Sequence, residues 1–185
     1  MLRQAFASTL MLVLLLGVAY PAVVTMVGQS LYPVQANGSL VLRDGRAVGS
    51  RLVAQRFDSD RYFHPRPSAA GEHGYDGRAS GGFNQGPTSR ALSDRLHETA
   101  TRLRAGQPST ALPVDLFTAS ASGLDPHITV EAARFQARRV AQARDVSTVR
   151  VNALIDAMTE GREMGILGQP RVNVLMLNLA LDDGV

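Results

Sequence analysis

The sequence predicts an α+β protein, in which one N-terminal transmembrane helix precedes a single mixed α/β domain with a small sheet. Three observations predict this class. Residues 5–27, a run of 23, carry no charged side chain. An Asp44-Gly45 pair separates two short runs of strand-forming residues. Further on, several stretches repeat apolar residues every three or four positions, and one repeats them every second position.

The run 5–27 is long enough to cross a bilayer as a helix. At 1.5 Å per residue it measures about 34 Å, against about 30 Å for a hydrocarbon core. Pro21 removes one helical hydrogen bond, which can kink the helix. The alternative is a cleaved signal peptide, with an apolar core of about 7 to 15 residues and a small-residue cleavage site. Apolar residues continue to Val27 without such a site, so we expect an uncleaved anchor.

The charges around this run predict its orientation. Arg3 and the amino terminus precede it, and the next basic residue is Arg43. By the positive-inside rule the N-terminus lies in the cytoplasm, so we expect a single-pass protein of the cytoplasmic membrane with its C-terminal domain outside. The expected division is a tail (1–4), a transmembrane helix (5–27), a linker (28–38) and an extracytoplasmic domain (39–185). The domain has no Cys, so it must fold on its core alone.

The segments after the anchor are predicted in order. Residues 39–53 form a hairpin around the Asp44-Gly45 turn. Residues 56–87 are rich in glycine and proline, but their five aromatic residues argue against disorder. We therefore expect an ordered, irregular segment that packs on the domain or on a partner. The remaining predictions are a helix over 88–105 ended by Gly106, a strand over 113–120, a helix over 129–144 capped by Thr129, a helix over 147–160 capped by Ser147 and stopped by Gly161, and a strand over 172–181.

Composition excludes several chemistries. All 19 basic residues are Arg, and Cys is absent. There is therefore no P-loop lysine, no Schiff-base lysine and no Cys nucleophile or metal ligand. The net charge is only +3. The closest basic cluster lies within 134–144 and shares a helix face with Glu131, which is typical of a solvated face rather than a nucleic-acid site. An acidic partner surface or anionic lipid remains compatible with it.

Two groups of residues suggest chemistry without matching its usual spacing. Ser120, Ser122, Asp125 and His127 are the residue types of a hydrolase triad, but no G-x-S-x-G elbow is present and triads assemble from separate parts of a fold. We interpret them as a turn that leads into a helix, and expect no catalytic residue. The second group is His64 and His73 with Asp58, Asp60 and Asp76. Its spacing matches no zinc or calcium pattern, so we expect no metal site.

The segment 80–88 is the most specific local motif. Its glycines allow sharp turns, Thr88 is expected to open a helix, and successive N–H groups at such a place can hold an anion. The alternative is a tight turn and helix cap that pack against a partner. The candidate nucleotide- or partner-binding residues are Ser80, Gly81, Gly82, Asn84, Gly86, Thr88, Ser122, Asp125 and His127.

Four segments together resemble the C subunit of the Kdp potassium-importing P-type ATPase. They read YFHPRPSA over 62–69, SGGxNxGPT over 80–88, DLxTASASGLDPHI over 115–128 and PRVNVLxLN over 170–178. Chain length, the single N-terminal helix and the order of the segments also match. The departures are Phe83, Gln85 and Phe117, where Ser, Leu and Val would be expected.

This resemblance implies an accessory, non-catalytic subunit of an ATP-driven, high-affinity potassium import complex. The implied partners are a channel-like potassium-binding subunit, the P-type ATPase subunit and a small single-helix subunit. The implied role is to support assembly and to act as a catalytic chaperone that raises the ATPase subunit's affinity for ATP. The protein itself would hold no covalent cofactor, and ATP would be reached through the ATPase subunit. The alternatives are a membrane-anchored envelope hydrolase and an unrelated envelope binding module.

Overall fold

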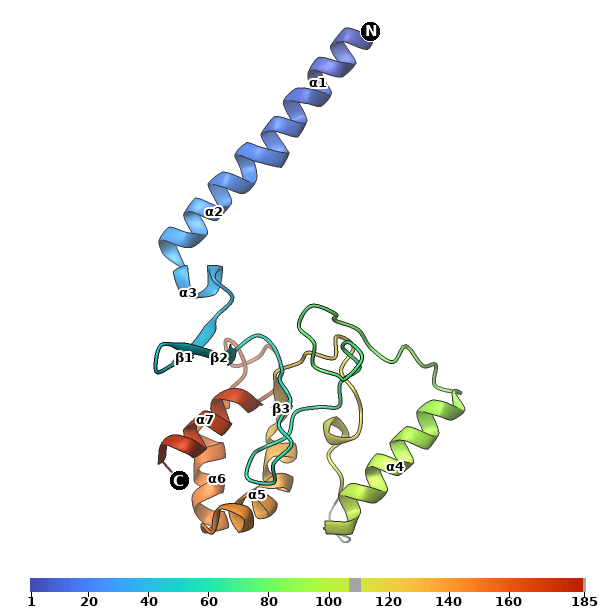
Figure 1. Cartoon of the computed structure of the whole chain (residues 1–185), viewed down its shortest axis with the longest axis vertical. Helices are drawn as coiled ribbons and strands as arrows, with labels where there is room; N and C mark the ends of the chain where they lie inside the picture. The colour runs from blue at the N-terminus through green and yellow to red at the C-terminus, as the bar shows by residue number, and fades with distance from the viewer. Residues whose placement is uncertain (107–110, 185) are drawn as a thin grey trace. The chain divides into compact units, whose positions relative to one another are not determined.

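A computed structural model describes residues 1–106 and 111–184 (Figure 1). The chain divides into two compact units, Met1–Ser50 and the part from Arg51 onward. The first unit holds a long apolar helix and a hairpin, and the second holds a small antiparallel sheet among helices. The predicted α+β class is confirmed.

The long helix of the first unit consists of α1 (Leu2–Leu14), a π-helical turn η1 (Leu15–Ala19) and α2 (Tyr20–Leu31). Within the described residues it is the one helix long and apolar enough to span a membrane, and none of its residues is buried. The π turn lies just before Pro21, where a helix must accommodate the missing N–H. The helix continues to Leu31, beyond the predicted 5–27, and ends before Pro33, because a residue preceding proline avoids the helical conformation.

A short helix α3 (Pro33–Ala36) leads into the predicted hairpin, which is confirmed. Its strands are β1 (Leu40–Arg43) and β2 (Arg46–Ser50), paired antiparallel. Asp44 and Gly45 both have positive φ, 51° and 75°. A type I′ turn requires this at both central residues, and Asp-Gly supplies it at little steric cost.

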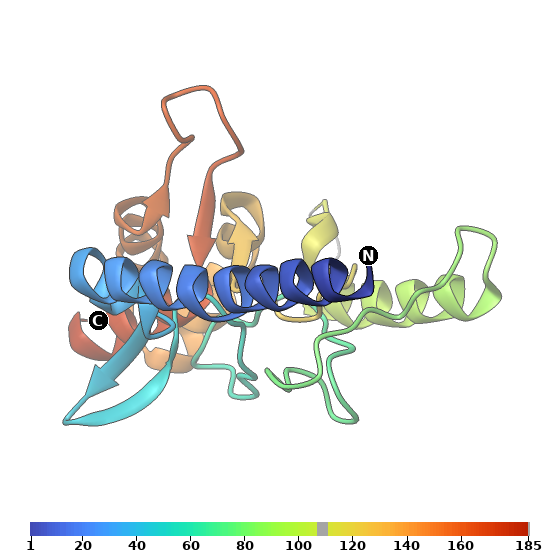
Figure 2. The same cartoon turned by 90° about the horizontal axis from the view of Figure 1, so that it is seen from above.

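The second unit is built around a three-stranded antiparallel sheet in the order β3-β5-β4. Its helices carry most of the core. The strands are β3 (His127–Thr129), β4 (Thr159–Glu160) and β5 (Arg171–Asn173). The helices are α4 (Arg90–Gly106), the 3₁₀ turn η2 (Val114–Leu116), α5 (Val130–Arg144), α6 (Thr148–Ala157) and α7 (Val174–Gly184). Figure 2 shows the segment between β4 and β5 extending as a long loop.

The core lies between α5, α6 and α7. Helix α5 buries alanines at 132, 133, 137 and 141 on its inner side, so that α6 can approach closely. The other fully or nearly fully buried side chains include Phe63, Ile128, Val140, Val151, Ile155, Val172, Leu177 and Leu181.

Two helix predictions are confirmed by their caps. The Thr129 hydroxyl accepts from Ala132 N–H at 3.1 Å, and Ser147 accepts from Arg150 N–H at 3.3 Å. Helix α6 ends at Ala157, before the predicted stop at Gly161, because Thr159 and Glu160 pair with β5.

Helix α4, predicted over 88–105, begins at Arg90 rather than at Thr88. The Ser89 hydroxyl accepts a hydrogen bond from Leu92 N–H and caps this helix.

The two strand predictions over 113–120 and 172–181 are wrong. Residues 171–173 are a strand, but α7 follows at once. The alternating leucines suggested a period of two, yet Val174, Leu177 and Leu181 also share one helix face and are all buried. Asn173 accepts from Met176 N–H at 3.2 Å, which caps the new helix. Residues 113–120 contain only the 3₁₀ turn η2 in place of a strand. Asp115 holds this turn against the start of α5, because its carboxylate accepts from the N–H of Thr129 at 2.7 Å.

The irregular segment 56–87 is ordered, and two side-chain amides hold it. Asn178 of α7 accepts from Phe63 N–H at 2.8 Å and donates to Phe63 C=O at 3.0 Å. Gln136 of α5 binds His64 in the same two-way manner, at 2.8 and 3.1 Å. The two amides pair with backbone N–H and C=O groups that a neighbouring strand would otherwise pair with. The Phe63 ring can therefore be fully buried in the core without leaving its backbone groups unpaired.

Candidate functional site

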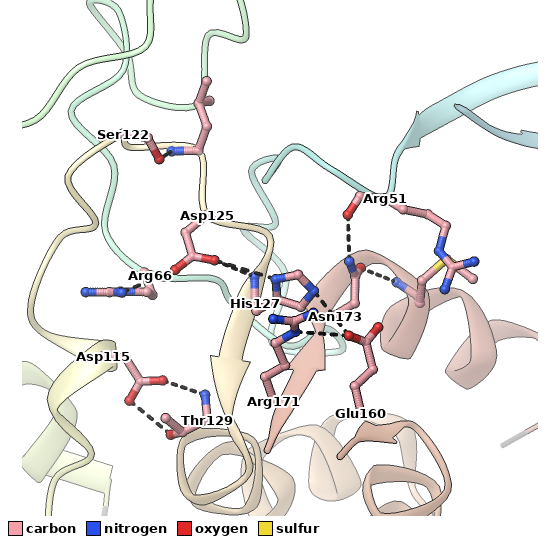
Figure 3. A network of polar contacts seen from close by, with 12 residues as sticks. Arg51, Arg66, Asp115, Ser122, Asp125, His127, Thr129, Glu160, Arg171 and Asn173 are labelled. Carbon is pink, nitrogen blue, oxygen red and sulfur yellow. Dashed lines mark hydrogen bonds and ion pairs between the residues drawn. The ribbon is translucent and has the colours of Figure 1, made fainter. Parts of the chain in front are cut away.

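Five charged or titratable side chains form a row of ion pairs beside β3 and β5 (Figure 3). Arg66 Nη1 donates to Asp125 Oδ2 at 3.2 Å. His127 lies between two carboxylates, with Nδ1 3.7 Å from Asp125 Oδ1 and Nε2 3.7 Å from Glu160 Oε2. Arg171 Nε donates to Glu160 Oε2 at 3.0 Å. This ion-pair row joins the loop before β3 to the strands β4 and β5.

The electrostatics of the row favour ionised Asp125. Burial alone would raise the pKa of this carboxyl. Hydrogen bonds from the side chain and backbone of His127, together with Arg66, outweigh burial and lower the pKa below its ordinary value. The carboxylate therefore stays charged at neutral pH and serves as the fixed centre of the row.

Three loops meet backbone to backbone next to this row, and we call this contact the loop junction (68–70, 80–82 and 121–123). Gly81 N–H donates to Ser122 C=O at 2.9 Å, and the Ser80 hydroxyl donates to the same oxygen at 3.0 Å. From the loop 68–70, the Ser68 hydroxyl donates to Gly123 C=O at 2.6 Å. The N–H of Gly81, one glycine of the predicted anion motif, is thus used within the chain.

The junction leaves no room for side chains at two of its glycines. A Cβ at Gly82 would lie 2.8 Å from the Ala121 carbonyl oxygen. A Cβ at Gly123 would lie 2.6 Å from Gly81 C=O and 2.8 Å from Ala70 N, and Gly123 has φ +67°. These positions need glycine for close approach, and the second also needs it for its left-handed conformation.

The structure separates the candidate site residues into three groups. Ser80, Gly81, Gly82 and Ser122 meet in the loop junction, and Asp125 and His127 belong to the ion-pair row. Asn84 has φ 51°, and Asn84, Gly86 and Thr88 are exposed on the way to α4. Whether any of them binds a nucleotide or a partner stays a prediction.

The Ser122 hydroxyl accepts from Leu124 N–H at 3.1 Å, and no hydrogen bond among the described residues joins Ser122 to His127. In Figure 3 the two residues lie on opposite sides of Asp125. The side chains flanking His127 are carboxylates rather than a nucleophile and its orienting acid. This arrangement differs from the Ser-His-Asp geometry of a hydrolase.

Sequence reasoning missed Arg66, Ser68, Gly123, Glu160 and Arg171 as members of these clusters. They come from four distant segments, and only the fold brings them together. One signal was available, since Arg66 stands between Pro65 and Pro67, where the backbone is stiff and can hold a side chain in place.

Phe83 and Gln85, two of the departures from the resembling motif, contact the same residue. The Arg95 guanidinium lies 3.9 Å from the centroid of the Phe83 ring, and its Nη2 donates to Gln85 at 3.2 Å. The pair therefore ties the loop to α4.

We expect a double-mutant cycle of Phe83→Ser and Arg95→Gln to give a coupling of about 0.5 to 2 kcal/mol, because each single change removes the same cation–π contact. Denaturant unfolding of the full chain in detergent, followed by circular dichroism, measures it. Arg104 lies on the same helix without this contact, so the cycle of Phe83→Ser with Arg104→Gln serves as the control. Additive effects in both cycles would contradict the coupling.

Comparison with known proteins decides the family. The family model described as KdpC, K+-transporting ATPase, c chain, matches residues 2–183. The chain belongs to the KdpC family. The Potassium-transporting ATPase KdpC subunit of Gemmatimonas aurantiaca is 51% identical over 182 residues, covering 98% of this chain and 92% of the relative. Those of Rhodopseudomonas palustris and Nitratidesulfovibrio vulgaris are 48% and 51% identical, each over 98% of this chain and over 96% and 93% of their own lengths.

In this KdpC chain the four motif segments are neighbours in space. The segment 62–69 contributes Arg66 and Ser68, and 80–88 contributes the glycine loop. The segment 115–128 contributes Asp125 and His127, and 170–178 contributes Arg171. The four motif segments therefore bind one another, through the hydrogen bonds of the loop junction and the contacts of the ion-pair row.

KdpC stability is expected to fall in mild acid through His64. Burial first, and then the charge of Arg139, lower the pKa of His64 below its ordinary 6.5. Below that pH the unfolded chain binds a proton more readily than the folded chain, so stability is full above 6.5 and declines as pH falls toward the folded pKa. Asp125, whose pKa is also lowered, adds a loss below about pH 4.

Thermal unfolding of the full chain in detergent between pH 7.5 and 5 tests this. His64→Gln should flatten the decline, because it removes the titrating group. His97→Gln makes the same change at an exposed histidine on α4 and controls for the substitution itself. An equal slope in the wild type and in His64→Gln would contradict the prediction.

Proposed function

We propose that this chain is a membrane-anchored, non-catalytic subunit of a potassium-transporting ATPase complex, which stabilises assembly and supports ATP use by the catalytic subunit. The observation that carries the proposal is that the motif segments bind one another through hydrogen bonds and ion pairs. Several donors and acceptors of the loop junction and of the ion-pair row bind groups within the chain. No hydrogen bond among the described residues joins Ser122 to His127, so the cluster has the character of a rigid docking module rather than of an active site.

The partners would be those that the family resemblance implies: a channel-like potassium-binding subunit, the P-type ATPase subunit and a small single-helix subunit. The lone Arg3 before the apolar helix favours a cytoplasmic N-terminus and an outer domain. In that orientation an effect on ATP affinity is a coupling free energy, transmitted through contacts between the membrane-embedded parts.

A direct nucleotide site at the glycine loop is the second candidate. Its glycine-rich backbone favours it, but Gly81 N–H already donates to Ser122 C=O and is not available to a phosphate. Binding of a phosphate by Gly81 N–H would require the junction to open. We therefore favour an indirect effect on ATP affinity, coupled through the membrane-embedded parts, over direct contact between this chain and ATP.

Purification of the tagged full chain under mild detergent tests membership in the complex. We expect it to bring down a large polytopic subunit and a P-type ATPase with potassium-stimulated activity, and to hydrolyse nothing by itself. Recovery as a lone monomer from cells that express all subunits would contradict the proposal.

Two further measurements test its details. A cysteine in place of Met164, which is 90% exposed, should react with an impermeant maleimide from outside, and a cysteine in place of Gln4 should not. Reaction of the first site only from inside would reverse the orientation. Protection of residues 80–88 from protease by ATP in the lone chain, lost in Gly86→Val, would favour direct binding, because a side chain at Gly86 meets nothing within 4 Å in the folded chain.

A further inference from the structure

A cleft of about 740 Å³ is lined by the irregular segment 56–75, by Arg102 and Leu103 of α4, and by helix α5. Its apolar lining is aromatic and aliphatic, with Phe57, Leu103, Leu116 and Phe135 among the lining residues. Phe135 and Leu116 belong to the core, and Leu103 packs against it from α4. The volume is in the range that holds a drug-sized ligand or a few side chains.

The charges of the cleft do not balance internally. Four arginines line it, together with two aspartates. Arg56 lies 3.7 Å from Asp58, and Arg139 lies 3.3 Å from Asp60. Each aspartate therefore has one arginine, and two arginines remain.

Arg139 is fully committed to the fold. Its Nη1 donates to Asp60 C=O at 2.8 Å, and its Nη2 donates to Tyr62 C=O and to Gln136, both at 2.9 Å. It thus holds the irregular segment against α5 and offers little to a ligand.

Arg102 of α4 and Arg138 of α5 are different. Both are exposed, and within residues 1–106 and 111–184 neither makes a hydrogen bond or an ion pair. Two guanidiniums without a partner in the described part of the chain thus line a cleft that also offers apolar surface. Planar guanidinium forks suit carboxylates bidentately, and arginine with aromatic residues is the combination enriched at interface hot spots.

We propose that this cleft receives a segment of another subunit of the ATPase complex, one that carries carboxylate side chains beside an apolar side chain. The carboxylates pair with Arg102 and Arg138, and the apolar side chain covers the Phe135 side of the cleft. This rests on the proposed function, because the occupant is a neighbouring subunit.

Charge favours a peptide over a lipid surface or a free phosphate. Asp58 and Asp60 line the same cleft, and their side chains are 82% and 75% exposed. They weaken the attraction of the arginines for a uniformly negative bilayer surface or a polyphosphate. A peptide can place its carboxylates on the free arginines and its N–H groups or basic side chains near the aspartates.

A single cysteine in place of Gln142, which lines the cleft, reports occupancy, since the native chain has none. Its alkylation rate is compared between the purified full chain in detergent and the assembled complex. We expect the rate to fall about tenfold or more on assembly, because a bound segment would cover position 142 and exclude solvent from it. A cysteine in place of Thr101, exposed on α4 and outside the cleft lining, should react equally in both.

Charge reversal tests the recognition itself. Arg102→Glu and Arg138→Glu should each restore fast alkylation at position 142 and make the association more easily lost in salt. Arg104→Glu and Arg162→Glu, exposed arginines outside the cleft lining, should leave both readouts unchanged. Unchanged thermal unfolding of the lone variants shows that they remain folded.

The outcomes separate the two proposals. If the complex assembles and position 142 reacts as fast as in the lone chain, the cleft is not an interface and the inference is overturned, while the proposed function stands. If the wild-type chain does not assemble into the complex, both the proposed function and the cleft proposal are overturned. If inorganic phosphate or phosphatidylglycerol vesicles protect position 142 in the lone chain, the site takes a small anion or a lipid surface respectively, and the peptide proposal is overturned.

Discussion

Replacing Asn178 by leucine is expected to lower the free energy of unfolding by about 2 to 5 kcal/mol. Asn178 is 1% exposed, and its amide satisfies both backbone groups of the fully buried Phe63. Leucine has nearly the same size but neither donor nor acceptor, so the N–H and C=O of Phe63 would be buried without partners. Each such group costs about 1 to 3 kcal/mol.

Denaturant unfolding of the full chain in detergent, followed by far-ultraviolet circular dichroism, measures the loss. The chain has no Trp, so tryptophan fluorescence cannot serve. Asn152→Leu on α6 is the matched control, because the buried Oδ1 of Asn152 has no hydrogen-bond partner among the described residues. That substitution should be neutral within about 0.5 kcal/mol or stabilising. Equal losses in both variants would show that the amide bonds to Phe63 contribute nothing specific.

Replacing Gly123 by alanine is expected to cost more than about 3 kcal/mol. The left-handed conformation of Gly123 alone costs a non-glycine residue about 1 kcal/mol or more. The new Cβ would also lie 2.6 Å from Gly81 C=O and 2.8 Å from Ala70 N, and both of these are backbone atoms that cannot turn aside. The loop junction must therefore open or shift.

The same substitution elsewhere in the segment supplies the control. At Gly86 an added Cβ meets nothing within 4 Å, and its φ is not in the left-handed region, so alanine should change stability by less than about 1 kcal/mol. Gly82→Ala should resemble Gly123→Ala, because its Cβ meets Ala121 C=O at 2.8 Å. Thermal unfolding of the three variants, with recovery of the complex at rising temperature, measures the effect. A Gly123→Ala chain as stable as the wild type would show that the junction is not tightly packed.

The parts of the fold that depend on neighbouring residues were predictable. The caps at Thr129 and Ser147, the Asp44-Gly45 turn and the uncharged run 5–27 are local signals, and the structure contains the caps, the hairpin and the apolar helix. The strand prediction over 172–181 failed for a physical reason. Leucine, methionine and alanine favour helices, and a run this apolar fits a period of two as well as a period of 3.6.

The sequence indicated some residues of the loop junction and the ion-pair row, but neither the remaining members nor their arrangement. The motif segments were recognised from their residues, and the glycines were seen to permit sharp turns. That Gly82 and Gly123 face other backbone atoms, and that His127 lies between Asp125 and Glu160, depends on contacts between segments distant along the chain, which local physics does not specify.

By itself the sequence determined the features that depend on charge, turn chemistry and residue types: an apolar helix fit for a bilayer, an α+β class, and a chain without lysine or cysteine chemistry. Only the tertiary structure decided where the polar groups of the irregular segment are satisfied. Burying Phe63 requires partners for its backbone, and α7 and α5 supply them through Asn178 and Gln136. Since a buried polar group must be paired wherever a partner lies in space, distance along the chain cannot reveal the answer.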